Sequence, residues 1–188
     1  VSNDGSIYLL QSNKVRRVSP DGIIQTIAGQ DSSGFAGDGE AAINSKLSGP
    51  TDLVQDSVGN LYVLDDGNKR VRIITKDGLI DTYAGNGKNK PSSTKHYDGD
   101  FALNASFNYF RGIAIDSVDN VYITEAGGRE WLYKISSALP GRGKTNFVLP
   151  DKSGREYYVF NKKGRHLKTL DAVTNRLIYE FKYNGQYL

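Results

Sequence analysis

Between residues 50 and 85 the chain alternates four short apolar runs with turn residues. The runs are rich in β-branched and aromatic residues and lie at 52–54, 61–64, 71–74 and 79–83. Gly-Asn and Asp-Gly pairs separate them, at Gly59-Asn60, Asp66-Gly67 and Asp77-Gly78. This pattern predicts an antiparallel meander of four strands. Because one such sheet cannot bury both of its faces alone, we also expect neighbouring sheets of the same kind.

The same pattern recurs along the chain at intervals of roughly 55 to 60 residues. The run 7–10 matches 61–64 and 121–124, and the stretch 15–29 matches 71–85. A four-stranded unit repeated at this period is typical of propeller blades. We therefore predict an all-β fold, with about three blades of a partial β-propeller in residues 1–136. Residues 39–47 are the one stretch with a helical pattern, and they predict a single turn at most.

A closed propeller needs at least four blades. The missing blades would come from upstream sequence, or the chain would be an open arc with exposed edges. The chain contains no Met, so Val1 is not expected to be a translation start and the sequence is expected to be part of a longer protein. No apolar run is long enough for a membrane helix, which predicts no membrane insertion in this segment.

Several Asp-rich turns could in principle hold a metal ion. Asp65, Asp66 and Asn68 form one candidate loop, and Asp38, Asp98 and Asp100 lie in the matching connections 34–42 and 97–105. Because these turns recur at equivalent places, we favour a structural role in tight connections that need a positive φ angle. The sequence predicts neither a metal nor another cofactor.

The chain contains few residues of the kinds that enzymes use for catalysis. There are two His, no Cys and no Gly-x-Ser-x-Gly motif, so we predict that the chain is not an enzyme. His96 ends the polar segment 86–96, which predicts an exposed, mobile loop. His166 lies on a predicted strand, where a surface role is favoured. Residues 141–145 end like a phosphate-binding loop but lack its preceding glycine spacing, so a linker is favoured.

The charge balance disfavours nucleic-acid binding. The net charge is +3, and residues 1–150 hold 16 basic and 17 acidic side chains, against eight and four in 151–188. Basic residues lie beside aromatic ones in the tail, which would suit single-stranded nucleic acid. We favour a core role for those aromatic residues, which are Tyr157, Tyr158 and Phe160.

The third copy departs from its siblings at two places. Arg129-Glu130-Trp131 replaces the usual turn sequence, and Asn108 to Arg111 lies upstream. Trp, Tyr and Arg are enriched among residues that dominate binding energy. The candidate binding residues are therefore Tyr109, Arg111, Arg129 and Trp131. The alternative is that they mark a seam between the propeller and the tail.

After Ser136 the pattern changes. Residues 137–150 are predicted to be a linker or a last propeller strand, and 151–188 contain three strands of shorter period, at 156–160, 164–171 and 176–183.

Two motif sets resemble known families. The GDG-x-x-A insert at 37–42, G-N-hydrophobic-Y-V-x-D at 59–65 and N-x-R-hydrophobic-R at 68–72 resemble the NHL-repeat propellers. The tail motifs G-R-H-L-x-T-L-D (164–171) and T-N-R-L-x-Y-x-F-x-Y (174–183) resemble the opening of the Rhs or YD-repeat family, with Asn184 where Asp is usual. The chain is thus similar to teneurins and to bacterial teneurin-like and Rhs-type proteins, in which the two occur in this order.

The resemblance implies a non-enzymatic binding or adhesion platform in a large secreted or cell-surface protein. Its implied partners are a protein or glycan ligand on the propeller face and the rest of the YD shell in the same polypeptide. The alternative that it leaves open is a shell-and-plug module of a polymorphic toxin that encloses a C-terminal effector. An extracellular or cell-surface location follows from the resemblance only.

Overall fold

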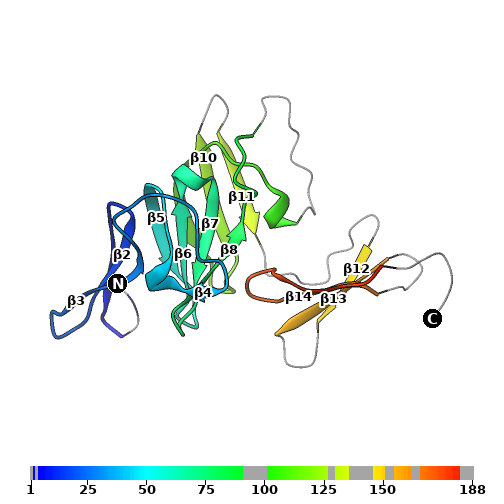
Figure 1. Ribbon diagram of the computed structural model, residues 1–188, viewed down its shortest axis with the longest axis horizontal. Helices are drawn as coiled ribbons and strands as arrows, with labels where there is room; N and C mark the ends of the chain where they lie inside the picture. Colours follow the sequence, from blue (N-terminus) through cyan, green and yellow to red (C-terminus); the bar gives the residue numbers. More distant parts are fainter. Residues whose placement is uncertain are drawn as a thin grey trace. The chain divides into compact units, whose positions relative to one another are not determined.

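The computed structural model describes residues 2, 4–90, 101–126, 130–135, 146–150, 155–161 and 166–182. The chain forms two compact units (Figure 1). Unit 1 comprises Val1–Lys95 and Ala102–Ile135, and unit 2 comprises His96–Phe101 and Ser136–Leu188. Each unit is built from antiparallel sheets, which confirms the predicted all-β fold.

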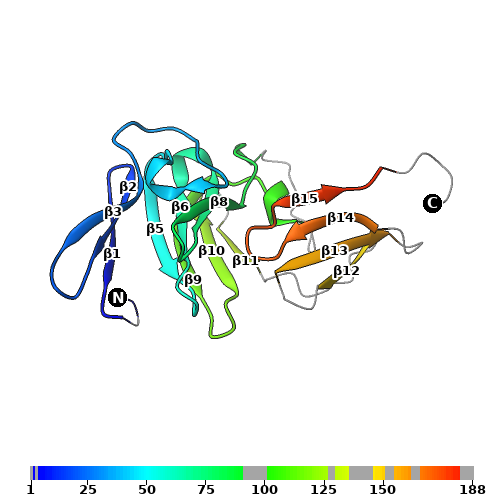
Figure 2. The ribbon, with the colours of Figure 1, turned by 60° about the horizontal axis from the view of Figure 1, so that its bottom comes forward.

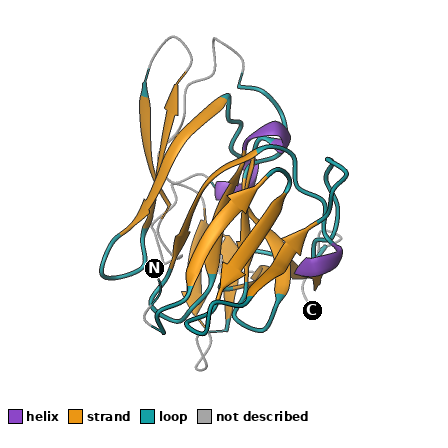
Figure 3. Cartoon of the chain, turned by 90° about the vertical axis from the view of Figure 1, so that its left-hand side faces the viewer, coloured by secondary structure: helices purple, strands orange, loops and turns teal. Residues whose placement is uncertain are grey.

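Helical structure in the described residues is limited to three single turns of 3-10 helix (purple in Figure 3). They are η1 (Ala42–Asn44), η2 (Asp66–Asn68) and η3 (Ala102–Asn104). The first confirms the single turn expected within 39–47. None of the described helices is long and apolar enough to span a membrane.

Unit 1 contains three copies of one sheet, which we call repeats 1, 2 and 3. Repeat 2 has the strand order β4-β8-β7-β6-β5, and the four strands predicted over residues 50–85 are confirmed. Its strands are β4 (Glu40–Ala41), β5 (Pro50–Gln55), β6 (Leu61–Asp65), β7 (Arg70–Ile74) and β8 (Leu79–Ala84).

Repeats 1 and 3 each show three strands among the described residues. Repeat 1 consists of β1 (Ile7–Gln11), β2 (Lys14–Val18) and β3 (Ile24–Gly29), and repeat 3 of β9 (Tyr109–Ile115), β10 (Val121–Ala126) and β11 (Trp131–Ile135). By sequence match β1, β6 and β10 are equivalent. The inner strands of repeats 2 and 3 are therefore β5 and β9.

All three repeats have the same turn ahead of the equivalent strands β1, β6 and β10. This turn explains why Gly, Asn and Asp occur there. The Asp56 carboxylate accepts hydrogen bonds from the backbone N–H of Val58 and Asn60, and Asp116 does the same for Val118 and Asn120. The residue before the Asn, or before Ser6 in repeat 1, has a left-handed backbone, with φ of 80° at Gly5, 100° at Gly59 and 63° at Asp119. Glycine and Asp tolerate this conformation better than most residues do.

The repeats pack side by side through their faces (Figure 2). Strand β5 contacts both β1 and β9, so the inner strand of repeat 2 lies against both of its neighbours. One core cluster joins repeats 2 and 3 and includes Leu64, Ile73, Phe107 and Ile123; another joins repeats 1 and 2 and includes Val15, Leu47, Val63 and Ile80. This is the arrangement expected of consecutive propeller blades.

Unit 2 is a four-stranded sheet in the order β12-β13-β14-β15. Its strands are β12 (Asn146–Pro150), β13 (Glu156–Asn161), β14 (His166–Asp171) and β15 (Leu177–Glu180). Residues 146–150 pair with β13, although the sequence suggested a linker or a last propeller strand over 137–150. The domain boundaries themselves stay a prediction.

The aromatic residues of β13 divide between the two faces of this sheet. Tyr157 is buried with Val159 and Leu170, as expected for a core residue. Tyr158 and Phe160 instead pack around the His166 ring, at centroid distances of 5.4 and 5.0 Å. His166 is thus half-buried in an aromatic cluster, and not on the open surface that we expected.

Candidate functional site

Asp65, the last residue of β6 in repeat 2, has a buried carboxylate. Asp65 accepts hydrogen bonds from the Ser48 N–H (2.7 Å) and from the Asn68 side-chain amide (2.7 Å). The Arg72 guanidinium lies 3.6 Å from its second oxygen. Burial raises the pKa of Asp65, and the donated hydrogen bonds and Arg72 oppose that rise. Because these donors already surround the carboxylate, the Asp65–Asn68 loop serves the sheet as a turn.

Arg72 connects this carboxylate to the Gly-Asp-Gly connection. Its side chain is fully buried, and its Nη2 donates to Asp38 at 2.7 Å. The second oxygen of Asp38 accepts from the Thr82 hydroxyl at 2.8 Å. Asp38 therefore fixes the connection to the sheet, which supports the structural interpretation of this turn. Among the described residues, no three His, Asp or Glu side chains are grouped so that they could hold a metal ion.

In repeat 3, different residues occupy the positions of Asp65 and Arg72. Glu125 stands where Asp65 does, and it accepts from the Asn108 N–H and from the Tyr133 hydroxyl (2.6 Å). Tyr133 takes the place of Arg72, and the missing positive charge comes from Lys90, whose Nζ lies 3.8 Å from Glu125. Burial lowers the pKa of Lys90 and raises that of Tyr133, while the Glu125 charge raises the pKa of Lys90.

The burial of Lys90 corrects one prediction. The polar segment 86–96 was expected to be an exposed loop, but the Lys90 side chain is only 7% exposed. The reason is that its ammonium group satisfies a carboxylate inside repeat 3 and donates to the Tyr133 hydroxyl at 3.1 Å. Residues 91–96 of the predicted loop, including His96, lie outside the described residues.

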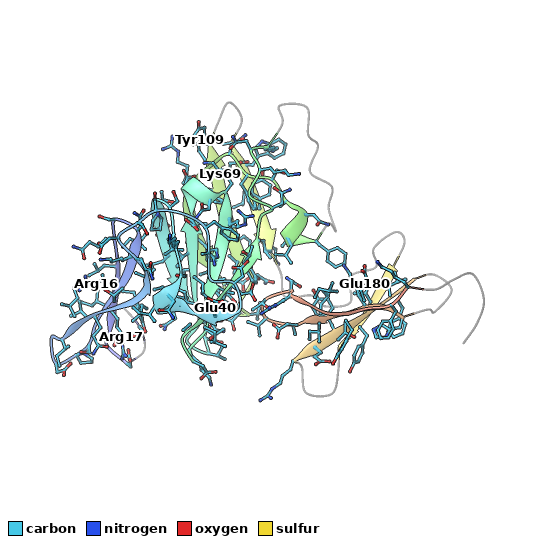
Figure 4. The ribbon with its side chains drawn as sticks, in the orientation of Figure 1. Arg16, Arg17, Glu40, Lys69, Tyr109 and Glu180 are labelled. Carbon is cyan, nitrogen blue, oxygen red and sulfur yellow. The ribbon has the colours of Figure 1, made fainter. Side chains whose placement is uncertain are left out.

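At the end of the repeats where β6 and β10 finish, three aromatic rings each pack against a cationic side chain. We call these six residues the cation–aromatic rim. Tyr109 faces the Nζ of Lys69 at 4.6 Å, and the two lie together in Figure 4. The other pairs are Phe35 with Arg70 at 3.8 Å and Trp131 with Lys90 at 4.1 Å. All three rings are partly exposed, and Tyr109 is the most exposed, at 62%.

The rim includes two of the four predicted binding residues. Tyr109 and Trp131 belong to it, while Arg111 is an exposed residue of β9 and Arg129 lies outside the described residues. Sequence reasoning missed Lys69, Lys90, Phe35 and Arg70. The repeat match could have pointed to Arg70 and Trp131, which occupy equivalent positions at the start of β7 and β11, whereas the pairing of Lys90 with Trp131 depends on the folded connection.

Comparison with known proteins shows similarity to teneurins along nearly the whole chain. Teneurin-m of Drosophila melanogaster is 27% identical over 200 residues, which cover 96% of this chain and 7% of that protein. Teneurin-3 of Danio rerio is 26% identical over 198 residues, covering 97% of this chain and 7% of the relative. The chain thus spans only a small part of these relatives.

Among solved structures, a protein of unknown function from Bacteroides thetaiotaomicron has a TM-score of 0.55 and 26% identity, covering 70% of this chain and 32% of its own. No protein-family model matches the chain. The similarity to teneurins that the motifs indicated is confirmed, whereas the NHL and YD assignments stay predictions.

Proposed function

We propose that this chain is a binding or adhesion module, without catalytic activity, of a large teneurin-like protein that is secreted or held at the cell surface. The observation that carries this proposal is the similarity to teneurins over 96% of the chain, which includes both compact units. In this proposal the repeats form a rigid platform, and loops at one end of them contact a protein or a glycan.

The cation–aromatic rim is the contact surface that we propose. Exposed Tyr and Trp side chains offer large contact areas at low entropic cost, and such residues dominate many interfaces. A cation stacked on each ring holds it in place, and two of these cations are also ion-paired, Lys69 with Asp66 and Lys90 with Glu125. Tyr109 and Lys69 would be the central contacts, because this ring is the most exposed of the three.

The polar chemistry of the described residues also favours binding over catalysis. The buried carboxylates Asp65 and Glu125 are each surrounded by donors. The ring of His166 packs against Phe160 and Phe181. A catalytic acid or base would need access to a substrate, and the buried Asp65 and Glu125 carboxylates lack it.

An adhesion assay tests the proposal. Beads coated with the chain are incubated with intact cells and with arrayed glycans, and retention is measured. Tyr109→Ala should reduce retention at least about tenfold, since hot-spot residues contribute 2 kcal/mol or more. Tyr179→Ala is the matched control, because Tyr179 in unit 2 is also 62% exposed.

Two results would contradict this assignment. No retention of the unchanged chain on any cell or glycan would argue against a binding module and would favour the shell-and-plug alternative. Equal losses for Tyr109→Ala and Tyr179→Ala would place the contact outside the cation–aromatic rim.

A further inference from the structure

Repeat 1 has an open edge that its siblings lack. Strand β6 lies between β5 and β7, and β10 lies between β9 and β11. Their equivalent β1 pairs with β2 alone among the described residues. The backbone groups along the other side of β1 are therefore available to a further strand.

The turn before β1 has the same backbone hydrogen bond as the turns that follow the inner strands β5 and β9. The Ser2 N–H donates to the Ser6 carbonyl at 2.8 Å. The equivalent bonds are Asp56 to Asn60 at 2.9 Å and Asp116 to Asn120 at 3.0 Å. Asp56 and Asp116 directly follow inner strands, which end at Gln55 and Ile115. The repeat therefore predicts that an inner strand ahead of Ser2 would pair antiparallel with β1.

A groove lies along this edge. Its volume is about 670 Å³, and it is bounded by Tyr8, Leu9 and Leu10 of β1 and by residues 51–55 of β5. Residues at the turn of repeat 3, Asp116 among them, also line it. Apolar side chains of β1 and β5 line this space together with polar residues such as Asp52 and Asp56, and the unpaired side of β1 lies along it. Such a groove suits an extended peptide that adds a strand to the sheet.

The outer face of repeat 1 is apolar but uncovered. Ile7 is 47% exposed, whereas its equivalent Leu61 is 3% exposed. Ile24 is 49% exposed, whereas Ile80 is fully buried. In repeat 2 these positions are covered by repeat 1 and by the connection that precedes β5. Repeat 1 therefore has the side chains of a packed sheet without the cover that repeat 2 has.

Among the described residues, Arg16 pairs with no carboxylate, whereas its equivalent in repeat 2 pairs with two. Arg16 is the equivalent of Arg72. Its Nη1 donates to Gln11 at 3.0 Å, and Gln11 occupies the position that Asp65 has beside Arg72. Arg72 receives its second carboxylate, Asp38, from the connection ahead of β5. The corresponding connection ahead of β1 would supply a carboxylate to Arg16.

We propose that the open side of repeat 1 binds a segment of the parent polypeptide that resembles residues 34–55. This segment contains an inner strand, antiparallel to β1, and a preceding turn whose carboxylate reaches Arg16. The strand lies in the groove, and the connection covers Ile7 and Ile24. The teneurin relatives are many times longer than this chain, so a protein of their kind has ample sequence for it.

Two extensions of the full chain at its N-terminus test the proposal. The short one adds a copy of residues 49–54 ahead of Val1, which aligns Val1 with Gln55. The expected result is a Tm higher by at least about 4 °C, with slowed hydrogen exchange on the open side of β1. The matched control replaces the copies of Leu53 and Val54 by proline, which cannot donate to a sheet. Equal Tm values for extension and control would overturn the strand assignment.

The long extension copies residues 34–54 and tests the contact with Arg16. It should raise Tm beyond the short extension, and an Asp→Asn change in the copy of Asp38 should remove most of that increment. No difference between the long extension and its Asn variant would overturn the carboxylate assignment. Sedimentation gives a further check, because a dimer of the unextended chain that no extension dissociates would mean that a second copy occupies the edge.

Discussion

The guanidinium group of Arg72 donates to the carboxylate of Asp38 at 2.7 Å across 34 residues of sequence. Arg72 is fully buried in repeat 2, while Asp38 lies in the connection that follows repeat 1. This ion pair therefore fixes the path of the chain between two sheets. Asp65, on the other side of Arg72, completes a buried charge cluster.

Removal of Asp65 should destabilise unit 1 strongly. Asp65→Ala leaves Arg72 with one carboxylate and leaves the Ser48 N–H without its acceptor, which should lower the free energy of unfolding by about 3–5 kcal/mol. Asp38→Ala should cost less, because the Asp38 side chain is 36% exposed. Urea unfolding measures both changes, with Asp77→Asn on an exposed turn as control. An Asp65→Ala variant as stable as the control would contradict the role of this cluster.

Two glycines of repeat 1 with nearly equal φ angles should respond differently to Ala. A Cβ on Gly29 (φ +81°) would lie 2.1 Å from the Asn13 carbonyl oxygen, while one on Gly22 (φ +82°) meets nothing within 4 Å. Gly22→Ala should cost about 1–2 kcal/mol for the left-handed backbone alone. Gly29→Ala should cost at least about 1–3 kcal/mol more because of the clash. Similar losses in thermal unfolding would show that Gly29 does not approach the Asn13 carbonyl this closely.

Lys90 should behave as a core residue despite its polar neighbours in sequence. Lys90→Met leaves Glu125 buried without its cation, which should cost about 3 kcal/mol. It should also change the fluorescence of Trp131, the single Trp of the chain, because the ammonium group lies 4.1 Å from that ring. Lys88→Met, on an exposed position, should change neither property. If both variants leave the spectrum and the stability unchanged, the buried position of Lys90 is wrong.

The turn at Asp116 should make folding sensitive to acid. The hydrogen bond from the Asn120 side chain lowers the pKa of Asp116 to about 2 from its ordinary 3.8, although partial burial opposes the shift. The folded state thus holds this proton less tightly than the unfolded state. Stability from this carboxylate is present above pH 4 and is lost as the pH falls from about 4 towards 2.

Thermal unfolding between pH 2 and pH 7 measures this dependence. Asp116→Asn should reduce the loss of Tm in acid, whereas Ser117→Ala, on the exposed neighbour, should keep it. A variant with the full acid loss would show that other groups are responsible.

The sequence predicted the local structure of repeat 2 well, because turn residues and apolar runs act over a few neighbours. Gly59-Asn60 and Asp77-Gly78 mark turns in the structure, and the strands between them were all predicted. The long-range partners were not predicted. Asp65 was correctly interpreted as a turn residue, but nothing local indicates that Arg72 and Ser48 share it.

The long-range partners in the cation–aromatic rim were not predicted either. Tyr109 and Trp131 were selected by residue type, and both belong to it, but the cations beside them come from other elements. Lys90 was placed in an exposed loop because its neighbours are polar, and only the fold brings it to Glu125. Local composition does not report a buried charge whose partner lies 35 residues away.

Consecutive repeats pack side by side through their faces, and the proposed rigid platform depends on this packing. The most direct test uses two spin labels on a chain that has no natural Cys, at Val58→Cys and Val118→Cys, which are exposed tips of equivalent turns. Ser57 donates to Asp119 at 2.6 Å beside these tips, so the account predicts one narrow and short distance distribution between the labels. A broad or long distribution, as expected for repeats that do not pack on one another, would contradict it.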